Sequence, residues 1–221
     1  MISVLCTPVH IITGDNIADM LQQAVEEWSL PSKPHPPIVT DNASNKEKAG
    51  IMFQAEYHIK CYAHTLNLAA QKSLKVKQIS HILSRMRKIV LFLHRSSVAT
   101  AKLREQAYIL KLPKHKLLID VPTRWNSAYD MISRFLEMQC AIITVLRMKE
   151  ISKFRDKDNN SFTDEDLTFA ENVMECLRPL KTVTTSLCTE SMPTISVIMP
   201  IQYTLLHKMQ TKDDTVMELN R

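Results

Sequence analysis

The sequence feature that most constrains the fold is an apolar stripe between Lys75 and His94. Its members recur every three or four residues: Val76, Ile79, Leu83, Met86, Val90 and Leu93. This spacing predicts one long helix that buries this face against other elements. The other face carries a basic line along the same helix, formed by Lys77, His81, Arg85 and Lys88. The chain must therefore cover the apolar stripe and keep the basic line at the surface.

Positive charge is concentrated around this helix. Residues 60–119 contain 13 Lys and Arg against the single acid Glu105, a net charge of +12; because the whole chain carries +5, the remainder carries −7. Such an excess inside an apolar-rich segment favours a polyanionic partner such as nucleic acid. The alternative is a solvated helix face, but such faces usually interleave Lys with Glu.

The pattern before this helix mixes short strands with helices. The predicted elements are a strand at Ile2–Thr7, a helix at Asn16–Trp28, a strand at Ile38–Thr40 and a helical region at Ser44–Leu74 with a break near Tyr57–Tyr62.

The pattern after the long helix Lys75–His94 becomes helical. We expect a helix at Ser97–Leu110, a third strand at Lys116–Val121 and a helix at Arg124–Lys149 that is capped by Thr123. Beyond a linker at Asp156–Asn160, Ser161 or Thr163 caps a helix to Ser186, and Pro193 opens a last helical stretch through Met209. The order of elements therefore changes from α/β to all-helical at about residues 125–150.

Composition narrows the class of protein. With 45% hydrophobic residues the chain can bury a core, and no stretch approaches the roughly 18 apolar residues of a membrane span. Because the N-terminus lacks the pattern of a signal peptide, we expect a soluble protein that is not secreted. The five cysteines are scattered (Cys6, Cys61, Cys140, Cys176 and Cys188), which favours reduced thiols in the cytosol or nucleus. The two glycines, Gly14 and Gly50, are isolated, which argues against a glycine-rich phosphate loop.

Asp41 lies in IVTDNASN, where a predicted strand ends and a helix is about to begin. In an open α/β sheet this edge is where ligands and metals bind. The alternative is that Asp41 only caps the turn, since short polar side chains accept from the free amides of a first helical turn. Both interpretations stay open on the residues alone.

Two further clusters carry chemistry. Cys61 and His64 form a C-x-x-H pair, but structural zinc takes four ligands and no second pair of suitable spacing follows. In PTRWNSAYDM, Arg124 and Trp125 lie at the predicted start of a helix. Without further context Trp125 is expected to fill the core, as most tryptophans do.

Four segments, in this order, resemble the hAT family of DNA transposases and the BED-type zinc-finger proteins derived from them. They are TDNASN (Thr40–Asn45), CYAHTLNL (Cys61–Leu68), DVPTRWNS (Asp120–Ser127) and PTISVIMP (Pro193–Pro200), preceded by AVEEWSLP (Ala24–Pro31). The resemblance implies a mixed, helix-rich α/β chain, namely an incomplete RNase H-like fold with an all-helical insertion domain. Residues 1–135 would form the partial RNase H-like domain and residues 136–221 the start of the insertion domain.

The resemblance also implies roles for single residues. Asp41 matches the second carboxylate of an Asp-Asp-Glu triad that holds two Mg²⁺ or Mn²⁺ ions for attack on a phosphodiester. Cys61 and His64 match a motif that positions the active site and DNA without zinc. Arg124 and Trp125 match the residues at which a flipped base stacks, a role that needs an exposed ring. In that light Lys77, Arg85 and Lys88 are expected to contact the DNA backbone.

The chain departs from the family at several points. The first Asp and the final Glu of the triad have no counterpart in it, and Lys46 replaces the usual hydrophobic residue after Asn45. We therefore expect a fragment or domesticated copy that acts in the nucleus as a DNA-binding transcription regulator, without catalysis, bound divalent metal or membrane partner. Zinc would be held only by a BED finger outside this chain, and a homodimer would form through a C-terminal segment outside it. The alternatives are a truncated active DNA transposase and a helical scaffold that binds acidic proteins.

Overall fold

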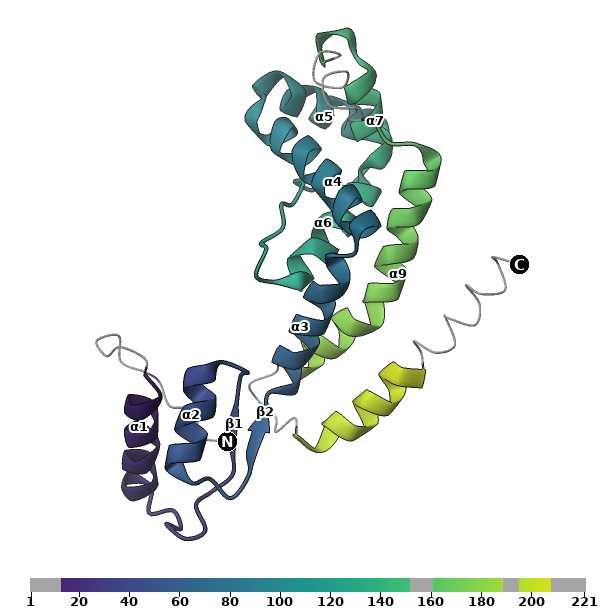
Figure 1. The fold of residues 1–221 in the computed structure, drawn as a ribbon. Coiled ribbons are helices and arrows are strands. Elements are labelled where there is room, and N and C mark those ends of the chain that lie inside the picture. The colour runs from purple at the N-terminus through teal and green to yellow at the C-terminus, as the bar shows by residue number, and fades with distance from the viewer. Residues whose placement is uncertain (1–12, 152–160, 189–194, 208–221) are drawn as a thin grey trace. The chain divides into compact units, whose positions relative to one another are not determined.

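The computed structural model describes residues 13–151, 161–188 and 195–207, and the predicted strand Ile2–Thr7 and linker Asp156–Asn160 lie outside them. The described backbone forms two compact units: residues 13–68 with 187–188 and 195–199, and residues 69–151 and 161–186 with 200–207. Figure 1 shows that the described chain is mostly helical, with one small sheet in the first unit. The prediction of a helix-rich chain is confirmed, and the domain boundaries at residue 135 stay a prediction.

The first unit pairs two helices with a parallel sheet. Helix α1 (Gly14–Glu27) packs along α2 (Ser44–Phe53), and β1 (Ile38–Thr40) pairs in parallel with β2 (His58–Lys60) (Figure 1). A small core of Val25, Ile38 and Phe53 holds these elements together. The predicted break in the helical region is confirmed, because β2 separates α2 from α3 (Tyr62–Leu74).

Both glycines of the chain lie where a neighbouring element leaves no room for a Cβ atom. A Cβ atom on Gly14 would lie 2.9 Å from Asn45 O and from Lys48 Cβ on α2. A Cβ atom on Gly50 would lie 2.4 Å from Nδ1 of His58 on β2. Glycine is therefore required at these two positions for packing.

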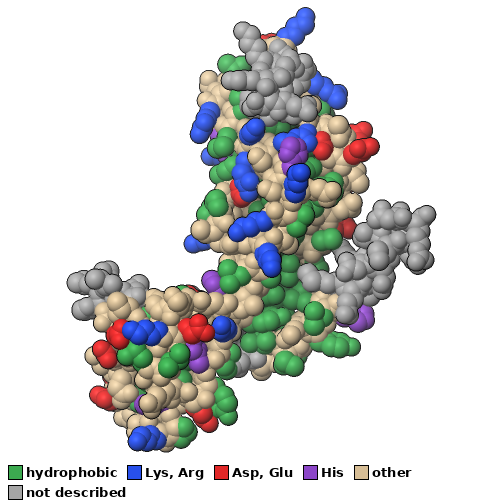
Figure 2. Space-filling model, in the orientation of Figure 1, with side chains coloured by type: hydrophobic (Ala, Val, Ile, Leu, Met, Phe, Trp, Pro, Cys, Tyr) green, Lys and Arg blue, Asp and Glu red, His purple; other side chains and the backbone are tan. Residues whose placement is uncertain are grey.

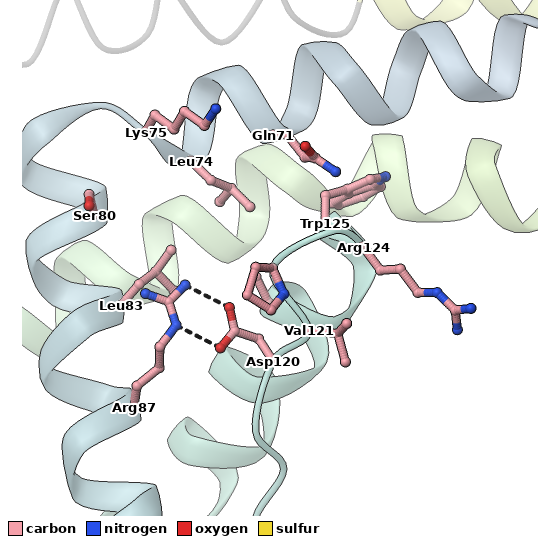
Figure 3. Close-up of a pocket in the computed structure, with 12 residues that line it drawn as sticks. Gln71, Leu74, Lys75, Ser80, Leu83, Arg87, Asp120, Val121, Arg124 and Trp125 are labelled. Carbon is pink, nitrogen blue, oxygen red and sulfur yellow. Dashed lines mark hydrogen bonds and ion pairs between the residues drawn. The ribbon is translucent and has the colours of Figure 1, made fainter. Parts of the chain in front are cut away.

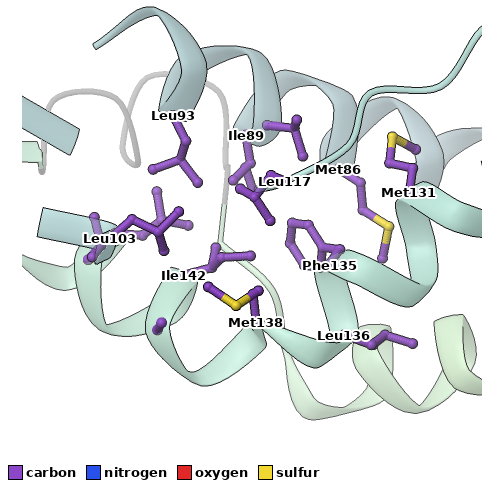
Figure 4. Packing of buried hydrophobic residues seen from close by; sticks show 14 of the residues in the cluster. Met86, Ile89, Leu93, Leu103, Leu117, Met131, Phe135, Leu136, Met138 and Ile142 are labelled. Atoms are coloured by element: carbon purple, nitrogen blue, oxygen red, sulfur yellow. The ribbon is translucent and has the colours of Figure 1, made fainter. Parts of the chain in front are cut away.

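The second unit is a helical body. Its elements are α4 (Lys77–Arg95), α5 (Ser97–Ile109), α6 (Trp125–Glu137), α7 (Gln139–Arg147), the short helix η1 (Lys149–Ile151) and α9 (Asp164–Leu187). Figure 4 shows that side chains from α4, α5, α6 and the start of α7 converge on one core, among them Met86, Leu103, Phe135 and Ile142. The predicted stripe is largely confirmed: Leu83, Met86, Val90 and Leu93 are buried, whereas Val76 precedes α4 and is exposed.

The predicted third strand, Lys116–Val121, is wrong. Among the described residues only β1 and β2 are strands, and residues 112–121 form an extended loop. Side chains, not a neighbouring strand, satisfy its backbone. His94 Nε2 donates to Leu117 O at 3.2 Å, Arg134 Nη1 donates to Lys116 O at 3.1 Å, and Val121 N donates to Ser127 Oγ at 2.7 Å. A run of β-prone residues forms a strand only where a partner strand is in reach.

The predicted helix Arg124–Lys149 is two helices. The backbone leaves the helical path at Met138, whose side chain is buried in the core, and α7 begins at the next residue. The predicted cap at Thr123 is also wrong, because Arg124 is the N-cap and makes no side-chain cap. Ser127, in the first turn of α6, instead ties the preceding loop to the helix, since its Oγ accepts from Val121 N and donates to Arg124 O.

Three helices end in the left-handed conformation without glycine. Ser29, Gln54 and Lys111 have φ values of 50°, 53° and 53° and follow α1, α2 and α5. After α5, Lys111 N donates to Tyr108 O and Leu112 N donates to Ala107 O, which is the Schellman pattern. This turn directs the chain back across the end of α5.

Helix α9 begins with a capping box. Asp166 N donates to Thr163 Oγ1 at 3.2 Å, and Thr163 N donates to Asp166 Oδ2 at 3.0 Å, which confirms the predicted cap at Thr163. The last described segment is helical from residue 195 to 207, whereas Pro193 and Met209 lie outside the described residues. None of the helices in the described part of the chain has the length and apolar character needed to cross a membrane.

Candidate functional site

The carboxyl ends of the two strands lie at one sheet edge. Asp41 follows β1 and Cys61 follows β2, and Cys61 N donates to Thr40 O at 2.6 Å. The predicted place of Asp41, between a strand end and a helix start, is confirmed. His64 lies in the first turn of α3, close enough to Asp41 to be among the influences that lower the pKa of that carboxyl. The fold therefore brings Asp41, Cys61 and His64 to the same edge.

Both carboxylate oxygens of Asp41 are engaged. Oδ2 accepts from Lys46 Nζ at 2.6 Å, and Oδ1 accepts from the Ala43 amide, the N-cap of α2, at 3.1 Å. The hydrogen bond from Lys46, above all, holds the pKa of this carboxyl below its ordinary value, although burial opposes the shift. Asp41 thus has the turn-capping contacts of the simpler interpretation, plus a lysine as counter-ion.

The described residues at this edge do not by themselves supply the ligands of a two-metal centre. Two divalent ions need several carboxylate ligands, and the described ranges contain no group of three His, Cys, Asp or Glu side chains placed to hold a metal. The cation next to Asp41 is the ammonium of Lys46, in a pair that is about one-third exposed on each side. Asp41 therefore acts as the partner of a lysine at this edge.

Arg124 and Trp125 lie in the helical unit, at the start of α6. Trp125 is 2% exposed, and its Nε1 is buried without a hydrogen-bond partner. Figure 3 shows its ring beside Gln71 and Leu74, whereas the side chain of Arg124 points away from them. The exposed ring that base stacking needs is therefore not found, and Trp125 packs as core, the alternative that the sequence left open. Arg124 itself is exposed.

An ion pair that the sequence did not reveal lies next to Trp125. Arg87 donates from Nε and Nη2 to the two carboxylate oxygens of Asp120, each at 2.6 Å (Figure 3). The hydrogen bond to Asp120 raises the pKa of Arg87. Both residues line a cavity of about 180 Å³ with Trp125. Asp120 is the first residue of the motif DVPTRWNS, and its place directly after the apolar residues Leu117–Ile119 is the sequence signal that indicates it.

The basic line on α4 is only partly available to a ligand. Arg85 forms a bidentate pair with Asp166 of α9, with both N···O distances at 2.9 Å, and its guanidinium lies 4.4 Å from the centre of the Phe162 ring. Arg85 also donates to Ser161 O. Its predicted place in a solvent-facing line is therefore wrong, since it ties α4 to the start of α9. Lys77 and Lys88 are exposed as predicted. Figure 2 shows Lys and Arg side chains spread over the visible face of the helical unit, with fewer Asp and Glu.

Similarity to known proteins identifies the family. The family described as the ZBED1 RNase-like helical domain matches residues 59–176. The chain belongs to this family. The matched region includes Cys61, His64, all of α4, and Arg124 with Trp125, whereas Asp41 precedes it.

Individual relatives agree with this assignment. Zinc finger BED domain-containing protein 4 of Homo sapiens is 28% identical over 201 residues, which cover 90% of this chain and 16% of that protein. The putative AC9 transposase of Zea mays is 28% identical over 180 residues, 75% of this chain and 21% of that protein. Zinc finger BED domain-containing protein RICESLEEPER 3 of Oryza sativa subsp. japonica is 33% identical over 100 residues, 44% of this chain and 13% of that protein. The chain thus spans 13 to 21% of the length of these relatives. The predicted relation to BED zinc-finger proteins and hAT transposases is confirmed.

Proposed function

We propose that this chain is a DNA-binding part of a nuclear, transposase-derived protein of the BED zinc-finger type, which regulates transcription and does not cut DNA. Its relatives include both zinc-finger BED proteins and a putative transposase, so the choice between regulation and catalysis depends on the site. We also infer that β1, α2 and β2 belong to an RNase H-like core.

The ion pair between Lys46 and Asp41 is the main support for the proposal that this chain does not cut DNA. An ammonium 2.6 Å from Asp41 Oδ2 already neutralises the carboxylate that metal-dependent phosphoryl chemistry would need. A divalent ion would have to displace Lys46 and would then meet its positive charge nearby. Lysine at this position therefore opposes metal binding at the strand end.

A cleavage assay tests this half of the proposal. Supercoiled plasmid incubated with the full chain and Mg²⁺ or Mn²⁺ should stay intact. In a separate binding measurement by paramagnetic line broadening, Lys46→Ile should increase the affinity of Asp41 for Mn²⁺. Metal-dependent nicking by the wild-type chain that Asp41→Asn abolishes would instead support the alternative, a truncated active transposase.

The exposed cations of the helical unit support the DNA-binding half. Lys77 and Lys88 on α4 reach solvent within residues 60–119, the segment that carries the excess of positive charge. Arg124, just before α6, is also exposed. Phosphate contacts by such side chains release counterions, so each contributes to the salt dependence of binding. Cys61, directly after β2, and His64, in the first turn of α3, are proposed to position the DNA without holding a metal.

A salt titration tests DNA binding. Anisotropy of a labelled duplex should give a plot of log K against log salt whose slope falls by about one unit for each phosphate interaction removed by Lys77→Gln, Lys88→Gln and Arg124→Gln. The matched control, Lys33→Gln, Lys72→Gln and Arg147→Gln, removes the same charge from exposed positions elsewhere. Equal slopes in the two triple variants would mean that these three cations are only solvated. Imaging of the tagged chain in cells tests the proposed nuclear location.

A further inference from the structure

A large apolar groove lies at the end of α5, in the helical unit. Its volume is about 900 Å³, and it runs between the end of α4, helix α5 and the extended loop that follows α5. Its floor consists of buried apolar side chains: Leu93, Leu103, Ala107, Leu117 and Met138. Pockets of this size and lining are typical of sites that receive apolar groups.

The rim of the groove is basic. Arg104, Lys111, Lys114 and Lys116 line it and are exposed, and no Asp or Glu is among the lining residues. The acids near this surface already have partners. Glu105 accepts from Lys102 at 3.0 Å, and Glu137 pairs with Arg134 at 2.8 Å and with His115 at 3.1 Å. The groove therefore combines an apolar floor with a positive rim.

The walls of the groove are fixed by hydrogen bonds. The Schellman turn after α5 places Lys111 in the left-handed conformation, and Leu112 N donates to Ala107 O at 2.9 Å. On the opposite wall, Leu117 O and Lys116 O accept from His94 and Arg134. Because these contacts lie within the chain itself, little ordering of the groove walls would be needed on binding.

The dimensions and the chemistry indicate one kind of occupant. The α5 residues that line the groove run from Thr100 to Tyr108, about two helical turns or roughly 12 Å. A partner helix presents apolar anchors at i, i+3 or i+4, and i+7 over about the same length. Tyr108, at the edge, is 78% exposed, and tyrosine is enriched among the residues that dominate interfaces. We propose that the groove binds an acidic amphipathic helix of a partner protein, whose apolar face meets the floor and whose Asp and Glu side chains meet the rim.

Single-stranded nucleic acid is the competing ligand, because it also carries negative charge. It is disfavoured by the floor, since bases stack on aromatic side chains and the buried floor residues are Leu, Ala and Met. A phosphate chain would satisfy the rim and leave the floor uncovered. The apolar floor is therefore the feature that separates the two ligands.

A peptide titration tests the proposal. The probes are a labelled 18-residue helix with Leu at i, i+3, i+7 and Glu elsewhere on its flanks, a scrambled peptide of the same composition, and an 18-nucleotide single strand. With the full 221-residue chain, we expect the amphipathic peptide to bind at least tenfold more tightly than the scrambled one. Binding should also shift the methyl resonance of Met138, which Met138→Leu assigns.

Variants then locate the site. The double variant Lys114→Glu with Lys116→Glu should weaken peptide binding at least tenfold, and Tyr108→Ala should weaken it about fivefold. The control double variant, Lys72→Glu with Arg147→Glu, makes the same change in charge and should not weaken binding. These are exposed positions, so circular dichroism should stay unchanged. Three outcomes would each overturn the proposal. The scrambled peptide could bind as tightly as the amphipathic one, the control double variant could lose as much affinity, or the single-stranded oligonucleotide alone could shift the methyl resonance of Met138.

Discussion

The carboxylate of Asp120 is bound on both oxygens by the guanidinium of Arg87, at 2.6 Å each, although the two side chains differ widely in exposure. The side chain of Asp120 is 3% exposed and that of Arg87 is 36% exposed. Removing either partner therefore has unequal consequences. Loss of Arg87 leaves a buried charge without a partner, whereas loss of Asp120 leaves a cation that reaches water.

We accordingly expect Arg87→Met to lower the free energy of unfolding by about 3 to 5 kcal/mol. Asp120→Asn should cost clearly less, because the amide oxygen still accepts a hydrogen bond and no buried charge remains. Urea denaturation of the two variants and of the double variant measures this difference. Equal losses in the two single variants would contradict the asymmetry.

Trp125 should contribute to folding. Since it is 2% exposed, Trp125→Ala is expected to lower the free energy of unfolding by about 3 to 5 kcal/mol through the cavity that it leaves. The chain supplies its own control, because its second tryptophan, Trp28, is 45% exposed and Trp28→Ala should cost less than about 1 kcal/mol.

Fluorescence gives a second measurement of the same difference. In Trp28→Phe the remaining indole should emit at short wavelength and resist quenching by acrylamide. A stable Trp125→Ala variant that loses affinity for single-stranded DNA would instead restore the stacking role.

Acid should weaken the contact between α4 and α9. Burial alone would raise the pKa of Asp166, but hydrogen bonds from Arg85 and from Thr163 outweigh it and lower this pKa from its ordinary value of 3.8. A lowered pKa in the folded state stabilises the fold above the ordinary value, and this stabilisation is lost as the pH falls through the folded-state value.

Asp166→Asn should therefore cost about 1 to 3 kcal/mol at neutral pH and lose less stability on acidification than the wild type. Thermal unfolding at a series of pH values measures both effects. Glu165→Gln is the control, since Glu165 is exposed at the next position of the same helical turn. The same loss on acidification in wild type and Asp166→Asn would mean that the ion pair contributes nothing.

Replacing Gly50 by alanine should destabilise the chain, the opposite of the usual effect of this substitution in a helix. Replacing a helical glycine by alanine normally stabilises a helix by about 1 kcal/mol. Here the new Cβ would lie 2.4 Å from His58 Nδ1, and the ring cannot turn away without breaking the interaction between His58 Nε2 and Thr40 Oγ1, 2.8 Å apart. We expect Gly50→Ala to destabilise the chain by about 1 to 3 kcal/mol.

The double variant Gly50→Ala with His58→Ala isolates this interaction. Without the ring the added methyl group has room, so Gly50→Ala should be neutral or stabilising in the His58→Ala background. A destabilisation of the same size in both backgrounds would mean that the effect does not come from His58. Urea denaturation of the four proteins completes the cycle.

Local patterns predicted the local elements well. The spacing of apolar residues predicted α1 and α4 to within a few residues, and the residues around Thr163 predicted the start of α9. The predicted bounds of α5 also agree with the structure to within a residue. These features depend on interactions within a few residues of the chain, which the sequence displays directly.

Long-range partners account for the wrong predictions. Arg85 was expected to face solvent because its place on the helix is opposite the apolar stripe, but Asp166, 81 residues later, lies within reach in the fold. The segment 116–121 has the composition of a strand, and only the absence of a partner strand beside it among the described residues decides against one. The burial of Trp125 likewise depends on elements that start more than 50 residues away, such as α3, whose Gln71 bonds Thr123 O.

The extended loop after α5 differs from a strand in how its path is encoded. In a sheet both ends of each ladder hydrogen bond are main-chain atoms, so no side-chain substitution deletes one. Here the bonds to Lys116 O, Leu117 O and Val121 N, and the bond to Thr123 O in the turn that follows the loop, each end on one side chain, from Arg134, His94, Ser127 and Gln71. A single side-chain substitution can therefore remove one of these hydrogen bonds and change the path of the loop. The turn that presents Arg124 is therefore adjustable by point mutation at Gln71 and Ser127, without changing Arg124 itself.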